Sequence, residues 1–251
     1  MKYLLILLLV ISYSVQSQIG LGGGTANRSS TAFGLEGNLA SNSILRGRNV
    51  IQEIIDVKKL NITVDDVEGS PYIPKEFVMG KLILDGKLTE NNLLRYNAYG
   101  DQFEIRNSDG SIGGINREPY LDIILMNETY SWFKYENEKQ EKEEGYLKSL
   151  YDGTSVDLLA KIEMEFKLGE KPRTSLHQEI PHKFVKNQRL YIKFPDSNPK
   201  AIKGKDIINH LDSDYKNVLK KYTKKNNLNL KNNLPDLISL LDYYESLKSP
   251  K

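Results

Sequence analysis

The chain contains no cysteine in 251 residues. This absence excludes disulfide bonds, thiolate nucleophiles and every cysteine-containing zinc site. Small secreted domains usually depend on disulfides, but a mature chain of roughly 230 residues buries enough apolar surface to fold without them. If the chain is exported, its lack of cysteine is more typical of a bacterial envelope than of a eukaryotic secretory route, and we expect a bacterial envelope protein.

Long hydrophobic runs are also absent. The one apolar stretch runs from Tyr3 to Val15 and is too short for a membrane-spanning helix, which needs about 20 residues. Met1–Ser17 has the charged start, apolar centre and small residues of a secretory signal peptide, with cleavage expected after Ser17. We therefore expect export to the periplasm, the outer membrane or the exterior, with no transmembrane segment in the mature chain.

Histidine is scarce, with three in the chain. His177 and His182 are five apart with Glu179 between them, which is the wrong spacing for a zinc-binding helix, and neighbouring prolines favour a loop. Ser175 precedes His177 closely, but no nucleophile-elbow motif surrounds any serine. We predict no catalytic residue, no metal ligand and no cofactor.

Acidic residues form two short clusters. Each is compatible with metal binding or catalysis, but each has a simpler explanation. Asp65–Glu68 has hard oxygen ligands for calcium but lacks the loop pattern with glycine at the sixth position. Glu163 and Glu165 share one face of a predicted strand, so a carboxylate pair for glycoside cleavage is conceivable. A solvated strand face explains this alternation more simply.

Net charge is small overall, at +2, but it is unevenly distributed. Residues 161–251 contain 19 Lys and Arg against 11 Asp and Glu, which gives +8. An exported protein meets little nucleic acid, so we predict no nucleic-acid partner. A basic face would instead meet anionic envelope polymers, lipid head groups or an acidic protein, and the simpler alternative is a solvated helix face.

The remaining sequence predicts an α+β fold. Residues 18–48 are rich in Gly, Ser and Asn and predict a flexible arm. Residues 49–199 predict short antiparallel strands joined by Asp-Gly turns, with a polar loop from Glu136 to Glu144. This pattern favours an antiparallel β-meander, either a curved sheet or a partly closed barrel.

Residues 200–251 predict a small three-helix subdomain. The first helix is expected over Lys205–Leu211, the second after an N-cap at Ser213, and the third after an N-cap at Asn233. Apolar residues recur at helical spacing in the last two helices, and five lysines lie mostly on the opposite face of the second.

Aromatic residues are the most useful positive signal, with fifteen tyrosines and one tryptophan. Tyrosine is common at binding surfaces because it combines an apolar ring with a polar tip. The most site-like cluster comprises Arg95, Tyr96, Asn97 and Tyr99, in which Arg95 would hold an anionic group. The alternative is that Arg95 pairs with Glu104 across a hairpin.

Several segments resemble a family of uncharacterised exported proteins of gram-negative envelopes. The resemblance covers roughly Val67 to Leu247. Its motifs are Gly69–Tyr72 with Phe77 and Gly80, Leu94–Asn97 with Tyr99 and Asp101–Glu104, Tyr146–Lys161, Lys224–Leu230 and Leu237–Tyr244. The resemblance implies an exported β-plus-helix protein without an assigned activity.

These observations favour an exported envelope binding or interaction protein, whose partner is an unidentified envelope protein or polymer. The sheet would carry the partner site, and we do not expect an enzyme. Two alternatives remain open, namely an exported hydrolase with an unrecognised site and a passive component of an envelope assembly.

Overall fold

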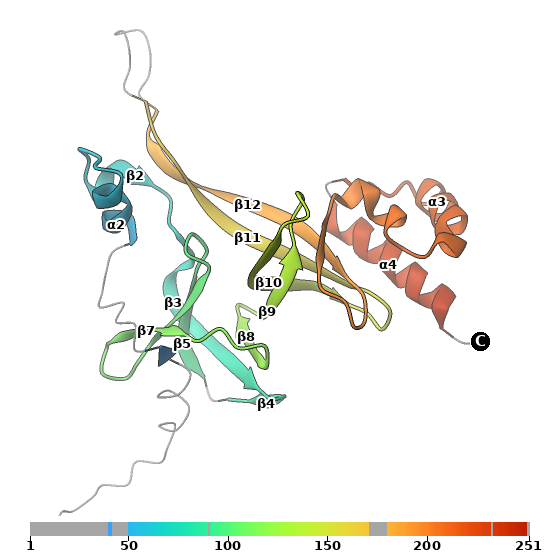
Figure 1. Ribbon diagram of the computed structural model, residues 1–251, viewed down its shortest axis with the longest axis horizontal. Coiled ribbons are helices and arrows are strands. Elements are labelled where there is room, and N and C mark those ends of the chain that lie inside the picture. The colour runs from blue at the N-terminus through green and yellow to red at the C-terminus, as the bar shows by residue number, and fades with distance from the viewer. Residues whose placement is uncertain (1–39, 42–49, 90, 171–179, 232, 250–251) are drawn as a thin grey trace, which may run out of the picture. The chain divides into compact units, whose positions relative to one another are not determined.

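The computed structural model describes residues 40–41, 50–89, 91–170, 180–231 and 233–249. The predicted signal peptide lies outside these residues, as does all of the predicted arm except Ala40 and Ser41. The fold is mixed α+β, as predicted, with one large and mostly antiparallel sheet followed by a C-terminal helical region (Figure 1). No helix among the described residues has the length and apolarity needed to cross a membrane.

The sheet has two strand systems that meet at β3. Its main path is β1-β7-β6-β5-β3-β8-β9-β10-β11-β12-β13, while β2 pairs with β12 and β4 with β3. The strands are β1 (Ala40–Ser41), β2 (Val67–Glu68), β3 (Tyr72–Leu84), β4 (Lys87–Leu88), β5 (Asn92–Asn97), β6 (Gln102–Arg106), β7 (Ile112–Ile115), β8 (Leu121–Leu125), β9 (Glu128–Glu136), β10 (Lys142–Asp152), β11 (Asp157–Lys167), β12 (His182–Lys193) and β13 (Lys200–Ile202).

The order of the strands departs from a simple meander most clearly at β3. Strands β5, β6 and β7 extend from one edge of β3, and the chain then returns to place β8 on the other edge. From β8 to β13 each strand pairs with the next one along the chain. The predicted Asp-Gly turn is confirmed between β3 and β4, where Asp85 and Gly86 both have positive φ.

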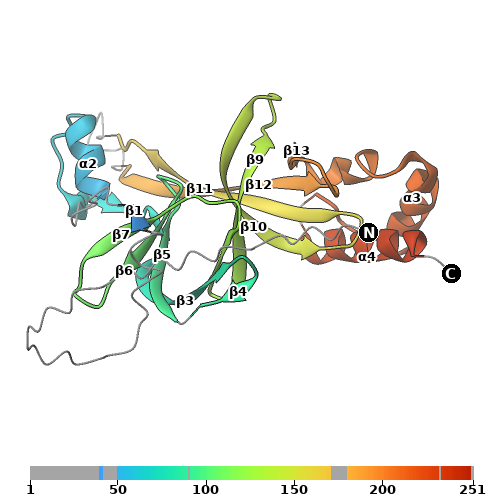
Figure 2. The same ribbon diagram turned by 60° about the horizontal axis from the view of Figure 1, so that its bottom comes forward.

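Five strands close part of the sheet into a ring. Strands β9 to β13 pair in sequence, and a parallel bridge between Lys200 and Glu136 joins β13 back to β9 (Figure 2). All five strands contribute to a small cluster, made up of the buried Tyr135, Leu147, Leu159 and Tyr191 and the partly buried Phe133 and Ala201. The inside of the ring is therefore filled with side chains.

The main core contains a group of aromatic residues among aliphatic ones and lies against the other face of these strands. Tyr96, Phe103, Tyr130 and Tyr146 are fully or almost fully buried, and their rings make stacked or edge-to-face contacts with one another. Such pairs are more favourable than their buried area alone implies. The predicted aromatic signal on the strands thus marks mainly core positions rather than a surface.

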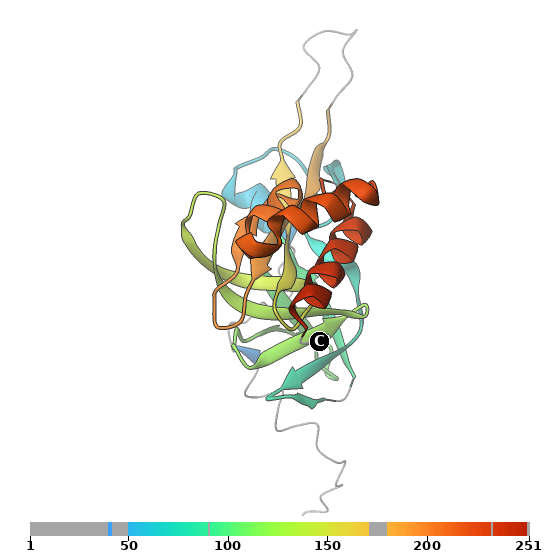
Figure 3. The same ribbon diagram turned by 90° about the vertical axis from the view of Figure 1, so that its right-hand side faces the viewer.

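The helical region covers one end of β11, β12 and β13. It contains the 3₁₀ helices η2 (Gly204–Asn209) and η3 (Ser213–Tyr215), and the helices α3 (Lys216–Lys225) and α4 (Leu234–Lys248) (Figure 3). Its apolar core joins Leu158 and Ile192 of the sheet to Leu219, Leu240 and Leu241 of the helices. The predicted helices are therefore present, but the first is a 3₁₀ helix.

The predicted N-caps were less accurate than the predicted helices. The Ser213 hydroxyl donates to Asp214 and caps no backbone N–H, because α3 begins three residues later behind a 3₁₀ turn. Asn233 does occupy the cap position of α4, with Pro235 in the first turn, but its side chain makes no capping hydrogen bond.

Two further expectations were wrong in the β region. Val50–Val57 forms a helix, α2, because Ile51, Ile54 and Ile55 recur at helical spacing, and the last two are buried. The expected polar loop is instead a hairpin in which β9 extends to Glu136 and β10 begins at Lys142. The Asn137 side chain closes its turn by accepting backbone N–H groups from Lys139 and Glu141.

Candidate functional site

The four residues predicted as a site do not converge on one surface. Successive residues of a strand point to opposite faces, so β5 directs Arg95 and Tyr96 to different sides of the sheet. Tyr96 is fully buried in the aromatic core. Asn97 organises the following turn by accepting the N–H of Gly100 at 2.9 Å. Tyr99 is 41% exposed and lines a pocket that Arg95 does not reach.

Arg95 makes the cross-strand pair that was the alternative to anion binding. Its Nη2 lies 2.6 Å from Glu104 Oε2, and its Nε donates to the same oxygen at 2.7 Å. The guanidinium also lies 3.6 Å from the centre of the Tyr72 ring. Burial raises the pKa of Glu104, whereas the charge of Arg95 opposes that shift. The guanidinium is thus already held by an internal carboxylate.

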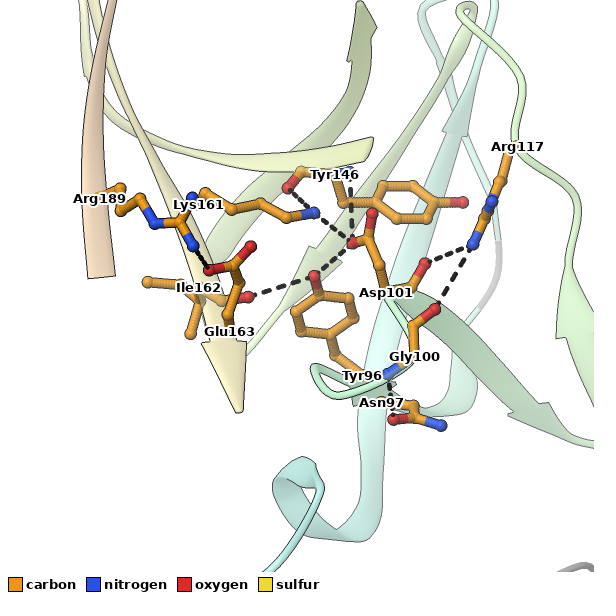
Figure 4. A network of polar contacts seen from close by, with 10 residues as sticks. All are labelled: Tyr96, Asn97, Gly100, Asp101, Arg117, Tyr146, Lys161, Ile162, Glu163 and Arg189. Carbon is orange, nitrogen blue, oxygen red and sulfur yellow. Dashed lines mark hydrogen bonds and ion pairs between the residues drawn. The ribbon is translucent and has the colours of Figure 1, made fainter. Parts of the chain in front are cut away.

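The most unusual geometry lies where β10 and β11 separate. Their backbone pairing ends at Lys148 and Ala160, and the same register would continue with Leu147 opposite Lys161 and then Tyr146 opposite Ile162. Side chains occupy this gap instead (Figure 4). Lys161 Nζ donates to the carbonyl oxygen of Tyr146 at 3.3 Å. The backbone N–H of Tyr146 points to Asp101 Oδ1 at 3.4 Å.

Tyr96 completes this arrangement from below. Its hydroxyl donates to Asp101 Oδ1 at 2.5 Å and lies 3.4 Å from the carbonyl oxygen of Ile162. Burial is the main cause that raises the pKa of Tyr96 far above its ordinary value, and the nearby carboxylate of Asp101 adds to it. Backbone groups that would otherwise pair across the two strands are therefore satisfied by side chains, as burial requires. We call this gap and its side chains the fork.

An ion pair between Asp101 and Lys161 is the centre of the fork. The Lys161 Nζ to Asp101 Oδ1 distance is 2.6 Å, and the side chains are 4% and 22% exposed for Lys161 and Asp101 respectively. Burial lowers the pKa of Lys161, and the charge of Asp101 opposes this effect. Arg117 fixes the turn from outside by donating to the carbonyl oxygens of Gly100 and Asp101.

Gly145 lies directly against this ion pair. A Cβ at position 145 would collide with Asp101 Oδ2 and would lie 2.6 Å from Lys161 Nζ. A side chain at this position would therefore force the ends of Asp101 and Lys161 to move. Sequence reasoning missed Asp101, Gly145 and Lys161 as a unit, although a single lysine inside the apolar run from Leu158 to Ile162 is the one signal that indicated a buried charge.

A pocket of about 500 Å³ opens beside the fork. Its charged lining consists of three cations and three carboxylates, Lys58, Lys161, Arg189, Asp101, Glu163 and Glu165, and its other lining residues include Tyr99, Tyr135, Phe166 and Asn187. The Arg189 Nη2 to Glu163 Oε2 distance is 2.5 Å, and Asn187 donates to Glu165 at 3.1 Å. We call this the fork pocket.

The floor of the fork pocket reaches the inside of the strand ring. Tyr135 lines the pocket and packs edge-to-face on Tyr191, with ring centres 5.0 Å apart. The Tyr191 hydroxyl is buried and makes no hydrogen bond within the described residues. Burial raises the pKa of Tyr191 to about 12. Pockets at the mouth of such closed strand systems are common places for small ligands.

The other residues that were considered for metal binding or catalysis are held by neighbouring groups of the protein. Asp66 accepts the backbone N–H and the hydroxyl of Thr63, so it caps a 3₁₀ turn. His182 Nδ1 accepts the N–H of Gly169 at 3.0 Å, while His177 and Glu179 lie outside the described residues. Glu163 and Glu165 share a face as predicted, but each is engaged by neighbouring side chains.

Comparisons of the chain with protein-family models, curated proteins and solved structures found no match. The geometry of the site is therefore the basis for a functional proposal.

Proposed function

We propose that this protein is an exported envelope binding protein, and that the fork pocket holds its partner. The export signal at Met1–Ser17 and the resemblance to exported envelope proteins support the location. The observation that carries the binding site is the pocket of about 500 Å³ whose lining has balanced charges and an exposed tyrosine at its rim.

The lining favours a polar ligand without a large net charge. Three cations and three carboxylates cancel within the pocket, so neither a polyanion nor a polycation is preferred. Hydroxyl or amide groups of an envelope polymer or protein can bond with the partly exposed Glu163 and Arg189, while Tyr99 contacts an apolar part of the ligand.

The way in which the carboxylates of the fork pocket are paired fits ligand binding better than hydrolysis. Asp101 is held by Lys161 and Tyr96, and Glu163 is held by Arg189. A hydrolase that uses two carboxylates needs one that gives up a proton and another that attacks or activates water. A carboxylate that is already bound to a neighbouring cation or hydroxyl group suits the orientation of a ligand more than attack on a substrate or proton transfer.

Photocrosslinking in the native envelope tests this proposal. A benzophenone amino acid at position 99 should form an adduct with an envelope component, whereas the same group at Tyr120 should not. Tyr120 is a matched control because it is also an exposed tyrosine and does not line the fork pocket.

Specificity is tested by altering the pocket beneath the probe. The double substitution Glu163→Gln and Arg189→Met removes the exposed pair at similar volume, so the adduct at position 99 should be lost. The same adduct from both positions, or an adduct that persists in the double variant, would show that the fork pocket is not the binding site.

A further inference from the structure

Helix α3 carries a dense lysine face that the fork pocket does not use. Lys220, Lys221, Lys224 and Lys225 are exposed, and Lys216 is partly exposed, within ten residues. At 3.6 residues per turn these five side chains fall within one half of the helix circumference. We call them the α3 lysine face.

The opposite side of α3 is fixed to the protein. Leu219 is fully buried in the core of the helical region, and the Tyr222 ring stacks on Tyr243 of α4 with centres 4.0 Å apart. The side chains on the exposed face are thus presented by a helix whose orientation is set by packing. A helix with its apolar side already buried cannot insert into a bilayer, but it can lie against a charged surface.

The α3 lysine face is not neutralised by neighbouring acids. Helix α3 contains no acidic residue, and within the described residues none of its five lysines forms an ion pair. Some lysines elsewhere are paired, for example Lys193 of β12 with Asp157 and Lys248 of α4 with Asp212. The contrast leaves a concentrated positive charge on one exposed helix face, which attracts anionic partners.

The chemistry of this face fits a lipid surface better than a single anionic group. It consists of lysines, which are point charges on flexible stems, and has no arginine fork for bidentate binding of one phosphate. Val218 is 39% exposed one helical turn from Lys221, so an apolar contact accompanies the charges. We propose that the α3 lysine face binds the surface of an anionic lipid bilayer.

Vesicle sedimentation of the full chain tests this proposal. We expect binding to vesicles of phosphatidylcholine and phosphatidylglycerol at 3:1, no binding to pure phosphatidylcholine, and weakening as salt increases. Because one lysine near an anionic surface strengthens binding about fivefold, the Gln variant of Lys220, Lys221, Lys224 and Lys225 should bind at least tenfold more weakly.

A variant with the same change in charge is the control. Lys87, Lys134, Lys139 and Lys142 are exposed on the β region, and their joint replacement by Gln should leave most of the vesicle binding intact. Thermal unfolding by circular dichroism checks that both variants fold.

Three results would overturn the proposal. These are a wild-type chain that does not sediment with anionic vesicles, an equal loss of binding in both variants, and binding to soluble heparin or DNA that depends on the α3 lysine face while vesicles are not bound.

Discussion

The two ends of β11 are held in the fold by different chemistry. At its start, Leu158 and its partner Ile192 pack against the helical region in a cluster made of apolar and tyrosine side chains. Towards its other end, beyond Ala160, the strand leaves β10 and is held at the fork by Lys161, Asp101 and Tyr96. The same strand is therefore held by apolar packing near its start and by buried polar contacts at the fork.

The two ends of β11 therefore differ in the side-chain substitutions that they tolerate. An apolar contact depends on volume, so a substitution of similar size is tolerated and the cost grows with the cavity that remains. A buried polar contact depends on completeness, because removal of one partner leaves the other unsatisfied in a medium of low polarity. The three predictions below test this contrast, beginning with the largest expected effect.

Asp101→Ala should be the most damaging change, with a loss of about 3–5 kcal/mol in the free energy of unfolding. It leaves Lys161 as a buried charge without its carboxylate and removes the acceptor of the Tyr96 hydroxyl. Urea denaturation measures the loss. The double variant Asp101→Leu with Lys161→Met should recover part of it, because no unpaired charge is then buried, while the Tyr96 hydroxyl and the Tyr146 backbone groups still lose their partners. A double variant as unstable as the single one would show that the ion pair itself stabilises the fork.

Sequence predicted the apolar end of β11 far better than the fork. Helical spacing in α3 and α4 is a local pattern, so the helices that cover this end of β11 were predicted from their own residues. The fork depends on Asp101 meeting Lys161 and Gly145 from a distant turn, and no local pattern encodes that meeting. Arg95 shows the intermediate case, because a hairpin register brings it to Glu104 and the sequence therefore offered that pairing as an alternative.

Leu240→Ala should cost about 3 kcal/mol, somewhat less than the loss of Asp101. Leu240 is fully buried in the helical region, where its removal leaves a cavity. Leu240→Met keeps most of the volume and should cost less than about 1.5 kcal/mol. Chemical denaturation of both variants gives the comparison. If the Met variant were as unstable as the Ala variant, the helical end would depend on side-chain shape rather than volume, and the contrast with the fork would fail.

Tyr96→Phe should have the smallest effect, about 1–2 kcal/mol at neutral pH, because one hydrogen bond to a carboxylate is lost while the ring remains. Its signature is the pH dependence. Burial and Asp101 raise the pKa of Tyr96 above its unfolded value of 10.0, so this contribution to stability is complete below that pH and is lost as pH rises beyond it. The stability of the wild type should therefore fall more steeply between pH 10 and about 11 than that of the Phe variant.

Lys161 also affects the pH dependence of stability, because burial lowers its pKa and this acts in the opposite direction to Tyr96. Both proteins contain that lysine, so the difference between their stability curves reports Tyr96 alone. Urea denaturation at a series of alkaline pH values supplies the two curves, and parallel curves would mean that the Tyr96 hydroxyl titrates in the folded protein as it does in the unfolded chain.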